Sequence, residues 1–339
     1  MPALHYPFDR VVPEFGQPLE VAPGIKWVRM PLPFALDHVN VWLISENDGW
    51  CAVDTGLSWE PCREIWQRVL KTHRLTRQLV THYHPDHIGL AGWLHKELGI
   101  DLWMTQAEYF TAQAVSEGAD DYAVDATVEL FRRHGLDEMD LDKLRQQGNA
   151  YRAVVSPIPS SFNRLSDNQI IRIGEHDWQV IVGYGHAVEH VSLYCEALQV
   201  LISGDMLLPS ISTNIPVMAS DPSGNPLLRY LESVRRFQEL PKNTLVLPCH
   251  GRPFVGAQLR VDAIEAHHRE RCYRILNATS NPKTAGDLQQ LLFDWGDMDA
   301  HQLFFAMGET IAHLNYLRES DLLRQIEDEE QNLTLFQEN

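Results

Sequence analysis

The chain has 339 residues, of which 44% are hydrophobic and 22% charged, a composition that allows a sizeable core and excludes a disordered or fibrous protein. Acidic residues outnumber basic ones by 46 to 28, so the net charge of −18 makes nucleic acid an unfavourable partner. No apolar run reaches the roughly 18 residues that a membrane span needs, and the first residues carry no targeting signal. We therefore expect a soluble, cytoplasmic protein without a membrane partner. The five scattered cysteines predict no disulfide framework.

The first part of the chain reads as strands followed by alternating helices and strands. Short β-branched or aromatic segments, separated by Pro, Gly, Asn or Asp, predict strands at residues 25–30, 39–45, 50–54 and 78–81. Apolar residues at helical spacing predict one helix from Ser58 and another from Ile88. An acidic helical insertion is expected over about residues 105–155.

Strands return after this insertion, and helices follow them. The expected strands are residues 170–173, 178–183, 191–194, 200–203 and 245–247. Two β-rich parts joined by an insertion favour an α/β (α+β) fold with a two-layer sheet core over residues 1–254. Residues 255–326 are helical throughout and are expected to form a small second domain, while the acidic residues 327–339 are expected to be frayed.

A histidine-rich segment lies where the strand at 78–81 gives way to a helix. In an extended chain, residues two apart point to the same side, so His82 and His84 can reach one cation. Because the chain then turns, Asp86 and His87 point elsewhere and can hold a second cation. Imidazole and carboxylate groups suit zinc and other first-row metals.

Three further ligand-type side chains each follow an apolar strand. They are His186, Asp205 and His250. Loops at sheet ends converge on one edge of a layered fold, where binding sites assemble. Seven such side chains from four segments are what a site for two metal ions needs.

These segments resemble the metallo-β-lactamase superfamily in sequence and in order. The motifs are H-x-H-x-D-H at 82–87, G-H-x-x-x-H at 185–190, S-G-D at 203–205 and P-x-H-G at 248–251, and the resemblance extends over roughly residues 20–255. It implies a four-layer αββα sandwich of two sheets flanked by helices. The helical tail resembles the β-lactamase-like protein 2 group, which implies a small, winged-helix-like C-terminal domain.

The resemblance also implies a role for each candidate residue. One metal is bound by His82, His84 and His186, the other by Asp86, His87 and His250, and Asp205 bridges them. Asp54 would orient ligand histidines from behind, and Asp86 and Asp205 could accept a proton from the attacking water. The cofactors are then two divalent ions, with zinc favoured and iron or manganese as alternatives. His190 has the spacing found in glyoxalase II and its relatives, but a purely hydrogen-bonded structural role fits equally well.

The implied activity is hydrolysis by a hydroxide bound between two metal ions. Asp205 stands where some true β-lactamases carry Cys, so the sequence is nearer to hydrolases that act on thioesters, lactones and phosphodiesters. The net charge of −18 and the absence of a Lys/Arg-rich run favour an ester, thioester or lactone in a small-molecule substrate, as in glyoxalase II-like hydrolases. One alternative is a phosphodiesterase or endoribonuclease, since the tail group includes a nuclease, but the basic residues Arg269 and Arg271 read as a solvated helix face. The other alternative is a non-catalytic metal-containing protein that binds a ligand. The sequence leaves open a homodimer and the roles of Tyr83, Tyr184 and Asn214.

Overall fold

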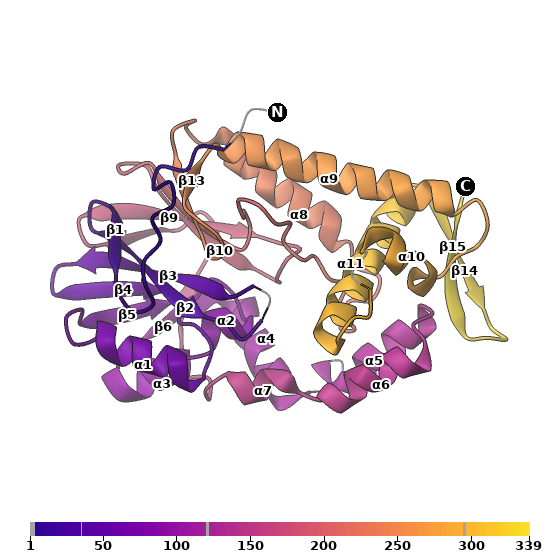
Figure 1. Ribbon diagram of the computed structural model, residues 1–339, viewed down its shortest axis with the longest axis horizontal. Coiled ribbons are helices and arrows are strands. Elements are labelled where there is room, and N and C mark those ends of the chain that lie inside the picture. Colours follow the sequence, from indigo (N-terminus) through magenta and orange to yellow (C-terminus); the bar gives the residue numbers. More distant parts are fainter. Residues whose placement is uncertain (1–3, 35, 120–121, 294–295) are drawn as a thin grey trace. The chain divides into compact units, whose positions relative to one another are not determined.

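The computed structural model describes residues 4–34, 36–119, 122–293 and 296–339 (Figure 1). The chain forms two compact units. The first comprises residues 1–116, 151–213 and 233–261, and the second comprises residues 117–150, 214–232 and 262–339. Both large sheets lie in the first unit, and the second unit is mainly helical.

The first sheet has seven strands in sequence order. They are β1 (Leu19–Ala22), β2 (Ile25–Pro31), β3 (His38–Glu46), β4 (Gly49–Val53), β5 (Leu75–Leu79), β6 (Leu102–Thr105) and β7 (Asn163–Leu165). Pairing is antiparallel as far as β4 and parallel from β4 to β7. Parallel neighbours need crossover connections, which helix α1 (Glu60–Val69) and helices α2 (Pro85–Ile88) and α3 (Ala91–Leu98) supply.

The second sheet has six strands in the order β13-β12-β11-β10-β9-β8. They are β8 (Ile170–Ile173), β9 (His176–Gly183), β10 (His190–Cys195), β11 (Val200–Gly204), β12 (Leu245–Pro248) and β13 (Phe254–Val255). Only β11 and β12 are parallel, and helix α8 (Pro226–Arg235) and the short helix η2 (Arg236–Glu239) connect them. Ser233 and Arg236 hold this connection against β9, because Ser233 accepts a hydrogen bond from the Tyr184 N–H and Arg236 donates one to the Val182 carbonyl.

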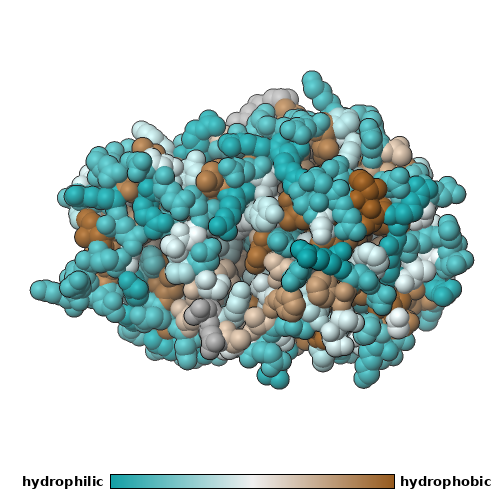
Figure 2. All heavy atoms as spheres, turned by 180° about the vertical axis from the view of Figure 1, so that it is seen from behind, coloured by the Kyte–Doolittle hydropathy of each residue, from teal (hydrophilic) through white to brown (hydrophobic). Residues whose placement is uncertain are grey.

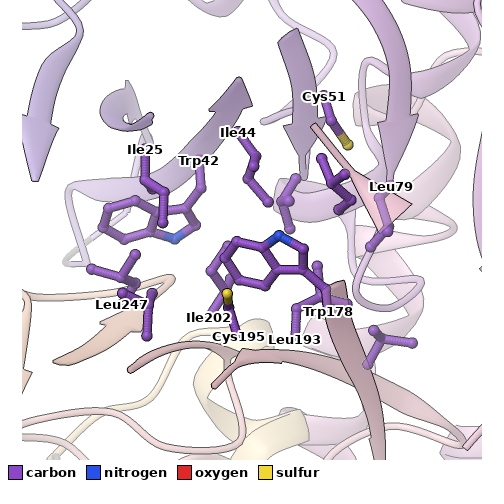
Figure 3. Packing of buried hydrophobic residues seen from close by; sticks show 14 of the residues in the cluster. Ile25, Trp42, Ile44, Cys51, Leu79, Trp178, Leu193, Cys195, Ile202 and Leu247 are labelled. Carbon is purple, nitrogen blue, oxygen red and sulfur yellow. The ribbon is translucent and has the colours of Figure 1, made fainter. Parts of the chain in front are cut away.

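The two sheets pack face to face over a large apolar core. Trp42 and Trp178 approach each other from opposite sheets, with Ile202 and Leu247 beside them (Figure 3). The other face of the first sheet is buried against α1 and α3, where Trp66 is fully buried. The first sheet is therefore apolar on both faces, because one face packs against the second sheet and the other against a layer of helices. The predicted layered sandwich is confirmed.

The predicted helical insertion is also confirmed, but its middle belongs to the second unit. Its described residues include the helices α4 (Gln106–Glu117), α5 (Val124–Arg133), α6 (Glu138–Gln147) and α7 (Ala150–Val154). Residues 117–150 group with the C-terminal helices rather than with the sheets, so the compact units do not follow the expected boundary at residue 254. Within the second unit, the backbone at Gly286 lies very close to that at Gly135, because an added Cβ at Gly286 would be 2.1 Å from the carbonyl oxygen of Gly135.

Three helices form most of the C-terminal region, and two of them begin at capping boxes. Helix α9 (Ala257–Ala278) is followed by α10 (Ala285–Leu292) and α11 (Ala300–Glu319). Thr284 with Asp287, and Asp299 with Gln302, form capping boxes that satisfy the free backbone N–H groups at the starts of α10 and α11. The predicted helical C-terminal region is confirmed.

The expectation of a frayed tail at residues 327–339 is wrong. Strands β14 (Leu323–Asp328) and β15 (Leu333–Glu338) pair as an antiparallel hairpin, and Phe336 is fully buried. Phe336 also exchanges backbone hydrogen bonds with Lys283. Along β15 the buried side chains alternate with more exposed ones, a period-two pattern that the surrounding acidic residues conceal in the sequence.

Hydrophilic side chains cover most of the surface shown in Figure 2. Within the described ranges, the helices are all too short or too polar to cross a membrane. The polar surface agrees with the large excess of acidic residues in the composition.

Candidate metal centre

The seven predicted ligands lie at strand ends of the first unit. His82 and His84 follow β5 in a bent loop, and Pro85 then begins α2, which carries Asp86 and His87 in a single helical turn. Proline at the first helical position fixes the backbone angle that starts the helix. The remaining three follow strands of the second sheet: His186 after β9, Asp205 after β11 and His250 after β12.

The first group of donor atoms comes from His82, His84, His186 and Asp205, whose donor atoms all lie within 4.8 Å of one another. The Nε2 atoms of His82 and His186 are 3.2 Å apart, and His186 Nε2 lies 3.4 Å from Asp205 Oδ2. The His84 ring stands edge-on to both other rings, with centroid distances of 4.4 Å and 4.6 Å. The structure thus brings together the three histidines that were predicted to share one metal.

The second group of donor atoms comes from Asp86, His87 and His250. Asp86 Oδ2 lies 3.4 Å from His87 Nε2 and 3.3 Å from His250 Nε2. Asp205 reaches this group as well, because its Oδ2 is 3.4 Å from His87 Nε2 and its Oδ1 is 3.4 Å from His250 Nε2. Asp205 therefore lies between the two groups, in the position that a bridging ligand requires.

This donor set fits two first-row divalent ions. Ligands about 2.0–2.1 Å from a tetrahedral zinc ion are separated from one another by roughly 3.3–3.4 Å, close to the separations in both groups. Two of the donor atoms, His87 Nε2 and Asp205 Oδ1, are buried and accept or donate no hydrogen bond within the described part of the chain. Buried polar atoms in proteins are normally satisfied, so these two atoms are suited to metal coordination.

Hydrogen bonds behind the centre orient two of the histidines. His87 donates its Nδ1–H to Asp54 Oδ2 at 2.9 Å, and His250 donates its Nδ1–H to the His38 carbonyl oxygen at 2.8 Å. Each bond directs the Nε2 lone pair of that histidine toward the other ligands, as is usual for metal-binding histidines. Asp54 is buried and has a positive φ of 66°, and its Oδ1 accepts the backbone N–H of Thr81. Asp54 thus occupies the orienting position expected for it.

Cys249 lies close to the centre but is held as a thiol. Its Sγ is 3.3 Å from Asp54 Oδ2, and burial together with the Asp54 carboxylate keeps the pKa of this thiol well above its usual value. A protonated thiol is a poor metal ligand, because the thiolate is the form that binds metals.

His190 holds the backbone of the bridging residue. Its Nε2 accepts the N–H of Asp205 at 3.0 Å, and its ring is fully buried. Burial and the neighbouring His186 lower its pKa well below the usual range, so the ring stays neutral and can act as an acceptor. An added Cβ at Gly204, where φ is +53°, would lie only 2.3 Å from His190 Cε1, so this position requires glycine. These contacts favour the structural reading of His190.

Burial and neighbouring charges shift the pKa values of His82 and His84 in the opposite direction to those of His87 and His250 in the metal-free protein. Burial and mutual repulsion lower the pKa values of His82 and His84 well below the usual range. Burial also lowers the pKa of His250, but the carboxylates of Asp205 and Asp86 outweigh this effect and raise the pKa of His250 to about 10. The pKa of His87 is likewise raised by these carboxylates against the effect of burial. A metal bound to the second group must therefore displace protons.

Two residues at the centre could not be singled out from the sequence. His38 supplies its carbonyl to His250 and accepts the Gly251 N–H at Nε2. Glu108, near the start of α4, is fully buried and accepts the backbone N–H groups of Tyr83 and Glu189. In the sequence Glu108 looks like any acidic residue of a solvated helix.

The three residues left without a role lie in different places. Tyr83 contributes backbone contacts beside the histidines, and Tyr184 is 40% exposed. Asn214 lies in the second unit, where its side chain donates to Glu309 Oε2 at 3.0 Å.

A further group of metal-capable side chains lies in the second unit, at His268, Glu309 and His313. Here Glu309 already pairs with Arg271 and accepts a hydrogen bond from Asn214, so both of its oxygens are engaged. We interpret the group as a buried polar network. The expectation of a solvated basic face is wrong for Arg271, which is buried, whereas Arg269 is exposed as expected.

Acid is expected to destabilise the second unit through His313. Burial lowers the pKa of His313 to about 3, while its Nδ1–H donates to the Glu309 carbonyl oxygen and its Nε2 lies 3.1 Å from His268 Nδ1. Unfolding would let this histidine take up a proton below its ordinary pKa of about 6.5. Between about pH 6.5 and about pH 3 the unfolded state therefore binds more protons, and the free energy of unfolding falls as the pH falls.

Urea unfolding of the metal-free protein between pH 8 and pH 5 measures this effect. Replacing His313 by asparagine is expected to reduce the loss of stability between pH 6.5 and pH 5 by roughly 2 kcal/mol, and to leave the slope above pH 7 unchanged. The same pH dependence in both proteins would contradict the assignment.

Comparison with known proteins agrees with the geometry of this centre. Residues 35–250 match the metallo-beta-lactamase superfamily, and residues 272–338 match the family described as metallo-beta-lactamase-like, C-terminal domain. The chain belongs to the metallo-beta-lactamase superfamily.

Similar proteins share nearly the whole chain. A crystal structure of a beta-lactamase domain protein from Burkholderia ambifaria is 40% identical, covers 99% of this chain and 98% of its own, and superposes with a TM-score of 0.92. The metallo-beta-lactamase family protein TTHA1429 from Thermus thermophilus is 28% identical, with coverages of 94% and 99% and a TM-score of 0.80. A Bacillus subtilis (strain 168) protein described as "Probable metallo-hydrolase YqjP" is 27% identical over 87% of this chain and 92% of its own length.

Proposed function

We propose that the protein is a metal-dependent hydrolase that cleaves an ester, thioester or lactone bond in a small-molecule substrate. The observation that carries the proposal is the position of Asp205 between two complete groups of donor atoms. A centre for a single structural ion would need only one such group. The Bacillus subtilis relative described as a probable metallo-hydrolase supports the same reading.

Two divalent ions at this centre would lower the pKa of a bound water toward neutrality and polarise the scissile carbonyl. The chain's own residues hold the ligands in place and handle protons. In the metal-free protein, the neighbouring histidines outweigh the effect of burial and hold the pKa values of Asp86 and Asp205 well below the usual range. Both carboxylates are therefore ionised, which is the form that binds a metal. In the proposed reaction one of the two also receives the proton that the attacking water gives up. Asp54 and the His38 carbonyl prevent rotation of His87 and His250.

The donor chemistry favours zinc, with iron or manganese as alternatives. Neutral imidazole and carboxylate donors suit all three ions, but zinc prefers the tetrahedral separations described above. No serine or cysteine nucleophile is needed, since water supplies the attacking oxygen.

Acyl substrates are favoured over phosphodiesters, because the basic pair on α9 that could have bound a nucleic acid is not fully accessible. Arg271, half of the basic pair on α9, is buried against Glu309 and is not available to contact phosphate groups. Sites that follow a nucleic acid backbone need concentrated positive charge, which a net charge of −18 opposes.

A panel of hydrolysis assays on the metal-loaded protein tests the proposal. It sets a thioester, a lactone, an ester, a β-lactam and a phosphodiester side by side, with the His84→Ala variant as the blank. We expect turnover of at least one of the thioester, the lactone and the ester, none of the other two, and none by the variant. Cleavage of the phosphodiester alone would overturn the proposed substrate class, and no turnover of any substrate would favour the non-catalytic alternative.

A further inference from the structure

Glu108 is a buried carboxylate close to the metal centre that forms no ion pair within the described residues. It lies in the first turn of α4 and is fully buried. Burying an ionisable group without a cation is costly, so such a group is normally compensated by hydrogen bonds or by a function. The contacts of its two oxygens indicate what that function is.

Each oxygen accepts one backbone N–H from a different ligand-bearing loop. Oε2 accepts the N–H of Tyr83 at 2.8 Å, and Oε1 accepts the N–H of Glu189 at 2.6 Å. Tyr83 stands between His82 and His84, and Glu189 stands between His186 and His190. The side chain therefore joins the two segments that supply the three histidines of the first group.

The carbonyl groups of the same two residues are also held. The Tyr151 hydroxyl donates to the Tyr83 carbonyl at 2.7 Å, and the Thr105 hydroxyl donates to the Glu189 carbonyl at 3.0 Å. Tyr83 and Glu189 are thus fixed through both their backbone N–H and their backbone C=O groups. Neither loop can shift without breaking one of these buried or partly buried hydrogen bonds, which costs free energy.

We propose that Glu108 is a positioning residue that couples the His82–His84 segment to the His186 loop and thereby sets the metal affinity of the first group. The inference rests on the proposed metal-dependent function. It concerns how tightly the first group binds a metal and does not depend on which substrate is cleaved. Outer hydrogen bonds of this kind determine how well ligands are oriented before a metal binds.

A carboxylate is the side chain that this arrangement requires. Both contacts are to N–H donors, and a carboxylate accepts at both oxygens. Glutamine has the same shape, but its NH₂ group would face one of the two N–H donors. Burial raises the pKa of Glu108 to about 7, while the two N–H bonds favour the charged form. A negative charge here also attracts a cation to the adjacent histidines.

The test compares Glu108→Gln with Glu117→Gln, which removes the same charge from an exposed position of the same helix. Cobalt(II) is titrated into each metal-free protein, and its visible absorption spectrum is recorded together with competition by a chelator. We expect Glu108→Gln to weaken binding at the first group by about 10- to 100-fold and to alter the cobalt spectrum, and Glu117→Gln to match the wild type. Wild-type affinity and spectrum in Glu108→Gln would overturn the inference.

Melting curves with and without metal separate positioning from a general loss of stability. If Glu108 only stabilises α4, Glu108→Gln lowers the melting temperature by the same amount with and without metal. If Glu108 is a positioning residue, the rise in melting temperature that metal produces is smaller in the variant than in the wild type. If Glu108→Gln does not fold, Tyr151→Phe takes its place, because it frees the same Tyr83 peptide without altering a buried charge. It is expected to weaken metal binding about fivefold, and unchanged binding would overturn the inference. None of these measurements uses a substrate, so the result stands apart from the outcome of the hydrolysis panel.

Discussion

Replacing His84 by alanine is expected to abolish turnover. We expect kcat/KM to fall by more than about 100-fold, because losing even an outer hydrogen-bond partner of a metal ligand can lower activity by up to about that factor. His84 supplies one of the three imidazoles of the first group and packs against the rings of His82 and His186. Removing it leaves His82, His186 and the shared Asp205, so an ion at this position is held more weakly. Bound metal, measured by elemental analysis, is expected to fall from two ions per chain to one or none.

The matched control is His5→Ala, because His5 is exposed and makes its described contact to β13 through the backbone. This variant is expected to keep wild-type activity and metal content. A His84→Ala protein with an unchanged rate would show that the metal assignment is wrong.

Removal of the metals is expected to lower the melting temperature markedly. Ions present at about a thousand times their dissociation constant stabilise the folded state by about 4 kcal/mol per site. With an unfolding entropy of about 2.1 cal/mol/K per residue, a chain of 339 residues changes its melting temperature by roughly 1.4 °C per kcal/mol, so the loss of one such site predicts a decrease of roughly 6 °C. The physical reason is that Asp86 and Asp205 are then balanced only by protonated His87 and His250.

Calorimetry before and after dialysis against a chelator measures this decrease. Adding back zinc, but not magnesium, is expected to restore the original melting temperature, because magnesium prefers oxygen donors and octahedral geometry. An identical melting temperature with and without chelator would contradict a metal centre that couples to folding.

The layered fold could be predicted because its strands are strongly apolar. Residues 39–45 and 200–203 coincide with β3 and β11, whose side chains are buried on both faces. The short β7 and the hairpin at the C-terminus could not be predicted in this way, because their polar residues leave little pattern. Nor could the membership of residues 117–150 in the second unit, which depends on a close approach between Gly135 and Gly286 that no local pattern records.

The candidate site was easier to predict where ligand chemistry is concentrated in motifs. Histidines and aspartates at strand ends have few roles other than metal binding, and the structure places all seven within two adjoining groups. Glu108 and His38 act through backbone atoms, at contacts between segments far apart in the chain. Burial of Arg271 against Glu309 depends in the same way on which helix faces inward. Sequence spacing alone does not reveal such contacts.

The parallel pairing of β11 with β12 has a consequence for the order in which the centre is completed. Asp205 and His250 follow these two strands, and the α8–η2 connection lies between the strands in the chain. During synthesis, a chain that has reached residue 210 already contains all four donors of the first group but only Asp86 and His87 of the second. The first group can therefore acquire a metal while the protein is still being made, whereas the second group is completed only once the stretch containing His250 has joined the sheet. Metal supply to a growing chain thus favours stepwise loading of the two positions.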